Sequence, residues 1–294
     1  FLVTVIITFI SMKFEQIMPS ATTMADATLP TVAMDTEAGT QYNVLHGYTS
    51  ELDSTLFYGN ITPVAKDRKL TVTINTYGED IEGVAYKIRS LEDKSLIENT
   101  EVSDYDNAGS SINVTFNIKN LLDTGKEYAL EIVLKTKKHE TVYYYTRIVY
   151  GVDYDLQKKL DFVMDFNACT FDDSRLKDIA GYLETSSSGD NTNYGKVNIN
   201  CSLSQVGWGD LDPYVESDIM PEVISVDDDV AILRLSYRVG AANDYSSSDT
   251  YTVSEYYRIR QTNSGFYLLN FEREMNQVFD ARNDLTSTAK INLG

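Results

Sequence analysis

Hydrophobic and polar positions alternate through most of the chain from residue 40 to residue 151. Between residues 112 and 118, and again between 128 and 134, every second residue is large and apolar. A period of two is typical of strands with one buried face. Short segments rich in Gly, Asn and Asp separate these runs, and we find no convincing helical period among them. The pattern predicts an antiparallel β-sandwich over residues 40–151, similar to immunoglobulin-like modules.

Beyond residue 151 the period changes to that of a helix. Apolar positions between residues 156 and 166 predict one helix, and those between 176 and 183 predict a second. Alternation returns between residues 197 and 273. Two helices followed by an antiparallel meander predict an α+β domain over residues 152–294. The predicted fold class is therefore mainly β, with an antiparallel sandwich followed by an α+β domain.

The first residues, Phe1–Ile10, are uncharged, and the first charge is Lys13. A membrane-spanning helix needs about 20 apolar residues, so we expect residues 1–18 to be a truncated transmembrane or signal-anchor segment. The alternative is a cleaved signal peptide with its cleavage site at Ala25-Asp26-Ala27. Either interpretation places the bulk of the chain outside the cytoplasm, and the anchor would make the membrane its first partner.

Residues 19–39 contain mainly Ser, Thr, Ala, Asp and Pro, with few large apolar side chains. A segment of this composition has too little apolar surface to fold by itself. We therefore expect a flexible stalk between the anchor and the sandwich.

Composition narrows the function classes. The chain has 294 residues, with 25 Lys+Arg against 44 Asp+Glu and a net charge of −19. Such a charge repels a phosphate backbone, which argues against nucleic acid as a partner. The two His lie in the predicted sandwich and the two Cys beyond it, without the close spacing of a zinc site, and we expect no metal and no cofactor. Cys169 and Cys201 are interpreted as reduced core residues, with a disulfide between them as the alternative.

Basic residues are distributed unusually in the last third of the chain. Between residues 197 and 289 there are six Arg and no Lys. Four of these Arg share parity within their predicted strands: Arg234, Arg238, Arg258 and Arg260. The pattern predicts an Arg-rich sheet face, and the planar guanidinium suits carboxylate or phosphate groups. The face is either a structural ladder with Glu272, Glu274 and neighbouring Asp, or a binding site for an anionic partner.

Glu255 is the opposite exception, because it lies in phase with Val253 and Tyr257 on an apolar strand face. It is turned to an edge, paired with an Arg, or a buried functional acid. The Tyr-rich runs 142–147 and 255–260 are candidates for a sugar-stacking surface, although Tyr also favours strands for purely structural reasons. The expected partners are thus an envelope protein, a glycan or an anionic ligand.

Three segments together resemble membrane-anchored extracytoplasmic proteins of Clostridia-type Firmicutes. They are Leu160–Phe166, Val206–Gly209, and the stretch from Glu255 to Gln277. The resemblance implies a cell-envelope location and a further module beyond Gly294, and it transfers no catalytic residue. We therefore expect a membrane-tethered binding or scaffolding protein without catalytic activity. The alternative is a secreted or anchored hydrolase that acts on cell-wall or dietary glycan.

Overall fold

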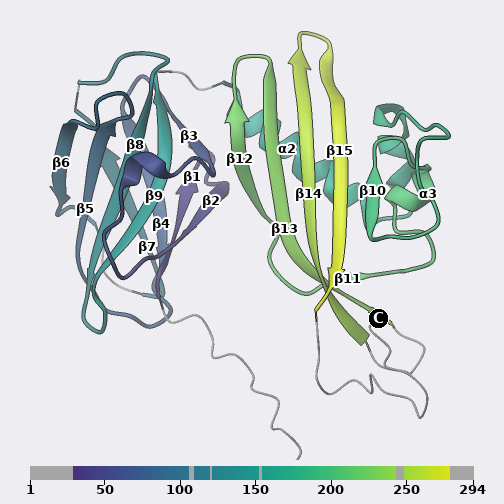
Figure 1. The fold of residues 1–294 in the computed structure, drawn as a ribbon, viewed down its shortest axis with the longest axis horizontal. Helices are drawn as coiled ribbons and strands as arrows, with labels where there is room; N and C mark the ends of the chain where they lie inside the picture. Colours follow the sequence, from purple (N-terminus) through teal and green to yellow (C-terminus); the bar gives the residue numbers. More distant parts are fainter. Residues whose placement is uncertain (1–28, 106–108, 120, 152–153, 243–247, 279–294) are drawn as a thin grey trace, which may run out of the picture. The chain divides into compact units, whose positions relative to one another are not determined.

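The computed structural model describes residues 29–105, 109–119, 121–151, 154–242 and 248–278, and Figure 1 shows its ribbon. The predicted N-terminal anchor and the start of the predicted stalk lie outside these ranges. No helix in the described part of the chain is long and apolar enough to cross a membrane.

The first sheet has four antiparallel strands in the order β2-β1-β4-β7. Its strands are β1 (Thr31–Asp35), β2 (Gln41–His46), β4 (Lys69–Asn75) and β7 (Ser111–Asn117). In β7 the buried residues are Ile112, Val114 and Phe116, as the alternation predicts. These side chains belong to the hydrophobic core.

The second sheet has five strands in the order β3-β9-β8-β5-β6. Its strands are β3 (Ile61–Val64), β5 (Ile81–Ser90), β6 (Leu96–Val102), β8 (Glu127–Thr136) and β9 (Glu140–Tyr150), with a short 3₁₀ turn, η1 (Ser54–Leu56), before β3. All pairs are antiparallel except β3 with β9, which run parallel. The edge position of β3 accommodates Pro63, which has no N–H to donate.

The predicted mainly-β fold class is confirmed, with antiparallel sheets and a small helical portion. A local detail also agrees with the sequence: the hydroxyl of Tyr128 accepts a hydrogen bond of 2.8 Å from the backbone N–H of Asp123. This contact resembles the tyrosine corner of immunoglobulin-like modules. It is a local feature and carries no function.

The stalk prediction fails at its C-terminal end, because residues 31–35 form β1. This strand pairs with both β2 and β4 and therefore lies inside its sheet. Val32, Ala33 and Met34 are fully buried. A strand buried on both faces shows a short continuous apolar run instead of alternation. Here that run is only three residues long and lies between Thr and Asp, so the sequence shows no strand period.

The third sheet carries the candidate site and has the order β10-β15-β14-β13-β11, with β12 also paired to β13. Its strands are β10 (Lys196–Asn198), β11 (Tyr214–Val215), β12 (Met220–Val226), β13 (Val230–Ala242), β14 (Ser248–Thr262) and β15 (Gly265–Gln277). The helix α2 (Leu156–Thr170) lies across one face of this sheet, behind the strands in Figure 1. The predicted first helix and the long antiparallel strands are thus present.

Two predicted elements differ. The second helix is a 3₁₀ helix, η2 (Leu176–Tyr182), because the chain must turn within seven residues so that Glu184 can donate to Ile199. The strand predicted beyond Asn198 is absent. There the chain turns and enters a single helical turn, α3 (Leu203–Val206), whose N-cap is Ser202.

The reason lies in the polar residues of that alternation, which favour turns and caps. The side chain of Asn198 accepts from the N–H of Asn200, and the hydroxyl of Ser202 accepts from the N–H of Gln205. Side-chain bonds of this kind compete with a sheet ladder. Cys201 is nevertheless buried, and both Cys201 and Cys169 are free thiols in the core, as the favoured interpretation predicts.

A buried lysine joins the start of α2 to the β12–β13 hairpin. The ammonium of Lys159 donates to the backbone carbonyls of Tyr154, Asp227 and Asp228 at 2.6, 2.7 and 3.0 Å. The Lys159 side chain has no exposed surface, and its burial lowers the pKa of the ammonium. Three carbonyl oxygens and the nearby acids compensate for the desolvated charge.

The central position of β1 leads to a first prediction, which bears on the proposed division at residue 40. A fragment spanning residues 28–151 should melt cooperatively, whereas one spanning residues 40–151 should not. Without β1, the strands β2 and β4 lose their shared neighbour and three fully buried side chains. Thermal melts followed by circular dichroism distinguish the two fragments. Equal, cooperative melting of both would contradict the role given to β1.

Candidate functional site

The strands β13, β14 and β15 have one buried and one exposed face along most of their length. In β13, Leu233, Leu235 and Tyr237 are buried, and the residues between them are exposed. The buried face packs against α2, where Phe166 contacts the rings of Tyr257 and Phe271. The opposite face is covered by no helix of the described chain in Figure 1.

All four predicted arginines lie on this exposed face, which we call the Arg face. The cross-strand neighbours of β13 and β14 on this face are Val230 with Arg260, Ile232 with Arg258, Arg234 with Tyr256, Ser236 with Ser254, and Arg238 with Thr252. Directly paired residues project from the same side of an antiparallel sheet. The parity argument from the sequence therefore placed the arginines correctly.

Arg234 is the arginine of this set that forms an ion pair. Its Nε and Nη2 atoms donate to Oε2 of Glu222 at 3.0 and 2.5 Å. Glu222 is the β12 residue directly opposite Arg234. Both side chains are partly exposed, and an exposed pair of this kind contributes at most about 1 kcal/mol.

The structural ladder predicted with Glu272 and Glu274 does not form. Among the described residues, no carboxylate oxygen lies within 4.0 Å of the guanidinium groups of Arg238, Arg258 and Arg260. Glu272 instead accepts from the Asn270 side chain, and Glu274 pairs with Lys196 at 3.6 Å. Three forks on the Arg face are therefore free to bind an external group.

The Arg face is hollowed next to Arg234. A hollow of about 380 Å³ is lined by Arg234, Ser254, Tyr256, Asn270, Glu272 and Glu274. A second, of about 370 Å³, lies around Ser236, Arg238, Thr252 and Asn276. Both are open depressions on the sheet. The first is lined by charged groups of both signs, whereas Arg238 is the charged residue that lines the second.

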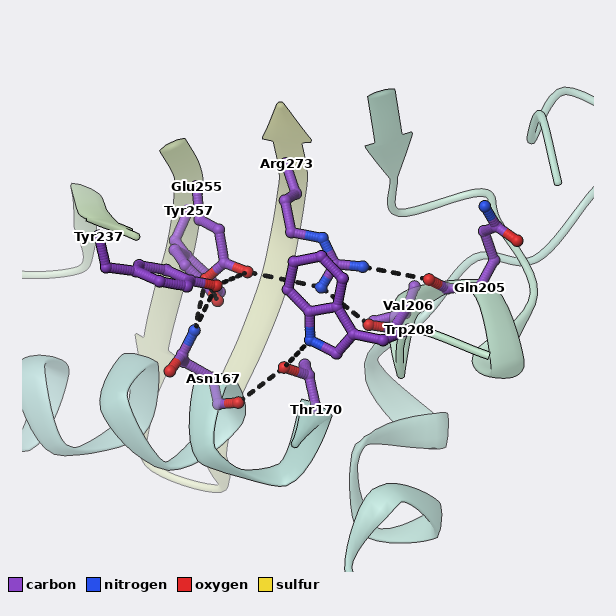
Figure 2. A network of polar contacts seen from close by, with 9 residues as sticks. All are labelled: Asn167, Thr170, Gln205, Val206, Trp208, Tyr237, Glu255, Tyr257 and Arg273. Atoms are coloured by element: carbon purple, nitrogen blue, oxygen red, sulfur yellow. Dashed lines mark hydrogen bonds and ion pairs between the residues drawn. The ribbon is translucent and has the colours of Figure 1, made fainter. Parts of the chain in front are cut away.

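Glu255 lies on the other side of the same strand and is fully buried. Its Oε2 accepts from the Asn167 amide at 2.8 Å and from the Tyr257 hydroxyl at 2.6 Å. Its Oε1 accepts from the Tyr237 hydroxyl at 3.0 Å and lies 3.6 Å from Nη1 of Arg273. Figure 2 shows these groups converging on the carboxylate from α2 and from the strands β13, β14 and β15.

Arg273 is the partner that sequence analysis did not identify. It is the β15 residue directly opposite Glu255, and it is also fully buried. Its two terminal nitrogens donate to the carbonyls of Val206 and Gln205 at 2.9 and 3.1 Å. Its guanidinium carbon lies 3.4 Å from the ring centroid of Trp208, a cation–π contact.

The network continues through Trp208 to α2. The indole N–H of Trp208 donates to the Thr170 hydroxyl at 3.3 Å, and that hydroxyl donates to the carbonyl of Asn167 at 2.8 Å (Figure 2). We call this set of side chains the buried network: Asn167, Thr170, Trp208, Tyr237, Glu255, Tyr257 and Arg273. The sequence did contain a signal for this position. Arg273 alternates in phase with the apolar residues Phe271 and Met275, which predicts that it lies on the inner face of the sheet.

The second of the three interpretations of Glu255 is therefore correct, since it is paired with an Arg. Its carboxylate has no exposed surface, and every direction of approach is occupied by a donor. The Glu255 carboxylate thus contacts protein groups on the inner side of the sheet, whereas the four arginines lie on the outer side.

The Tyr-rich runs are buried in part, and Tyr143 and Tyr256 are their partly exposed tyrosines. Tyr144, Tyr145 and Tyr257 are buried, and the Tyr144 hydroxyl donates to the carbonyl of Pro30 at 2.7 Å. Within the described residues, no group of three or more His, Cys, Asp or Glu could hold a metal ion. The Arg face presents exposed guanidinium groups to a partner.

No family model matches the sequence, and no curated protein matches it. Among solved structures, the chain is similar to the crystal structure of Spo0M, a sporulation control protein from Bacillus subtilis. The two share 8% sequence identity, the match covers 74% of this chain and 86% of that chain, and the TM-score is 0.22. A score this low supports no inference about fold or function.

The buried network predicts a loss of stability in alkali. Burial, together with the charge of Glu255, raises the pKa values of Tyr237 and Tyr257 well above the ordinary value of 10.0. Both tyrosines therefore bind their protons more tightly in the folded state. The free energy of unfolding should be unaffected by them below about pH 10 and should fall as the pH rises above it.

Tyr257→Phe should make this fall shallower by up to about 1.4 kcal/mol per pH unit, which is the contribution of one proton. Urea denaturation of both proteins between pH 9 and 11 measures the two slopes. Tyr267→Phe is the matched control, because its ring is 53% exposed and it should leave the slope unchanged. Identical slopes for Tyr257→Phe and the parent protein would contradict the assignment.

Proposed function

We propose that the chain is a non-catalytic binding or scaffolding protein of the bacterial cell envelope, and that the Arg face is its contact surface. The observation that carries the proposal is that Arg238, Arg258 and Arg260 are exposed and have no acidic partner within the described part of the chain, although the net charge is −19. Acids outnumber bases across the chain, so available carboxylates are abundant. Arginines that nevertheless stay unpaired on one face suit an external anionic group.

The interior of the same region supports a contact role over catalysis. The one acid that sequence analysis singled out there, Glu255, is saturated by hydrogen bonds and an ion pair beneath the sheet. A catalytic acid must reach the atom with which it exchanges a proton. The proposed location at the membrane, with the bulk of the chain outside the cytoplasm, rests on the uncharged segment Phe1–Ile10.

The alternative is a hydrolase that acts on cell-wall or dietary glycan. Its acid pair would be Glu272 and Glu274, which lie two residues apart on β15 and both line the hollow beside Arg234. Same-face residues two apart in a strand are separated by about 7 Å, within the range that an inverting glycosidase needs. This pair gives the alternative a specific test.

A single set of variants tests the proposal. The triple variant Arg238→Gln/Arg258→Gln/Arg260→Gln should lose capture of solubilised envelope components by the immobilised full chain, because the free forks are removed. Its melting temperature should stay within a few degrees of the parent value, since none of the three forms an ion pair with a described residue.

A separate experiment tests the location. The full chain expressed in a Gram-positive host should fractionate with membranes and be cleaved by protease added to intact cells.

Arg175→Gln is the matched control, because Arg175 lies outside the Arg face and pairs with Asp165. This variant should capture solubilised envelope components as the parent protein does.

Glycosidase or peptidase activity of the purified chain, abolished by Glu272→Gln or Glu274→Gln, would overturn the non-catalytic proposal in favour of the alternative. Release of a mature chain beginning near Thr28 into the medium would contradict the membrane tether.

A further inference from the structure

The Arg face changes character along its length. Around Arg234 the neighbouring strands supply carboxylates, from Glu222 on β12 and Glu272 on β15. Toward the β14–β15 turn they do not. There the β15 neighbours of the arginines are Asn270, opposite Arg258, and Tyr267, opposite Arg260, and the β13 neighbours are Ile232 and Val230. We call Arg258, Arg260, Tyr267 and Asn270 the hairpin patch.

The two arginines of the hairpin patch follow each other along the same face of β14. Arg258 and Arg260 are two residues apart on the same face of β14, so their Cα atoms are separated by about 7 Å. Each fork can bind one carboxylate or phosphate through two parallel hydrogen bonds. The pair therefore suits a ligand that carries one or two oxyanions.

Tyr267 gives the patch a second kind of contact. Its side chain is 53% exposed, whereas the tyrosines of the two Tyr-rich runs at positions 144, 145 and 257 are buried. An exposed ring with a polar tip can pack against the C–H face of a sugar and donate a hydrogen bond to a hydroxyl. The half-buried Ile232, opposite Arg258, extends this apolar surface.

Charge and topology restrict the ligand further. The net charge of −19 opposes a densely charged polymer, whereas a single acidic group is screened from distant charges beyond about 10 Å at 0.1 M salt. The strand β14 is central in its sheet and offers no free edge, so a peptide cannot bind there by strand addition. What remains is a ligand with few charges and a flat apolar face.

We infer that the hairpin patch binds a saccharide that carries one or two acidic groups, either carboxylate or phosphate. The guanidinium forks hold the oxyanions and the ring of Tyr267 packs against a sugar ring. This inference rests on the proposed contact role of the Arg face and names the ligand class and the end of the face that binds it.

Calorimetric titration tests the inference on the full chain. The probes are digalacturonate with its neutral methyl ester, and mannose 6-phosphate with mannose. At least one acidic probe should bind, and its neutral counterpart should bind at least about tenfold more weakly. The better acidic probe identifies carboxylate or phosphate as the preferred group. Arg258→Gln/Arg260→Gln should lower the affinity at least about tenfold, and Tyr267→Ala should lower it several-fold.

The matched control is Arg175→Gln/Lys177→Gln, which removes the same charge from a partly exposed site outside the Arg face and should bind as the parent does. Equal binding of the acidic and neutral probes, equal affinity of the Arg258→Gln/Arg260→Gln variant, or no binding of any probe would overturn the inference. Envelope capture that depends on Arg238 alone would overturn only this inference, and the proposed contact role would stand. Capture that is insensitive to all three free arginines would overturn both.

Discussion

The ion pair between Glu255 and Arg273 is the interaction on which the C-terminal sheet depends. Both side chains are completely buried, and removing two charges from water costs several kcal/mol each unless every polar atom finds a partner. The carboxylate accepts from an amide and two hydroxyls. The two terminal nitrogens of the guanidinium donate to carbonyls and its face lies against Trp208, whereas its buried Nε has no hydrogen-bond partner among the described residues. These partners come from α2, from β13 and β14, from α3, and from Trp208 just after α3.

This arrangement fixes the position of the α3 turn and α2 against the sheet. Val206 and Gln205 present their carbonyls to Arg273, while Asn167 reaches Glu255 from the helix. A shift of either element would leave a buried charge without a partner, which is far more costly than the loss of an apolar contact. With one face of the sheet closed in this way, contacts with a partner through the faces of β13 and β14 must use the other face. The free arginines lie there.

Much of this could be predicted from the sequence because it follows from period and parity. The alternation at residues 112–118 and 128–134 predicts buried strands, and shared parity placed the four arginines on one exposed face. Prediction failed where tertiary contacts override local pattern. The strand at residues 31–35 is short, with Val32, Ala33 and Met34 consecutive between Thr and Asp. The turn after Asn198 is directed by side-chain bonds instead of by the alternation.

The candidate site was predictable only in part for the same reason. Pattern analysis could place Glu255 on the inner face, but cross-strand register identified its partner as Arg273, and register depends on the turn and on a bulge near Arg258. Likewise, sequence could not tell that Arg234 is paired with Glu222 while Arg258 and Arg260 are free. That distinction depends on which strand lies beside each arginine.

A double-mutant cycle between Glu255→Leu and Arg273→Met tests the central claim most directly, with the free energy of unfolding measured in urea by circular dichroism. Each single variant leaves a buried charge without its partner and should lose about 3–5 kcal/mol. The double variant removes both charges, so its loss should be smaller than the sum of the two by about 2 kcal/mol or more. Losses that simply add would contradict the account, because the two charges would then not be held by each other.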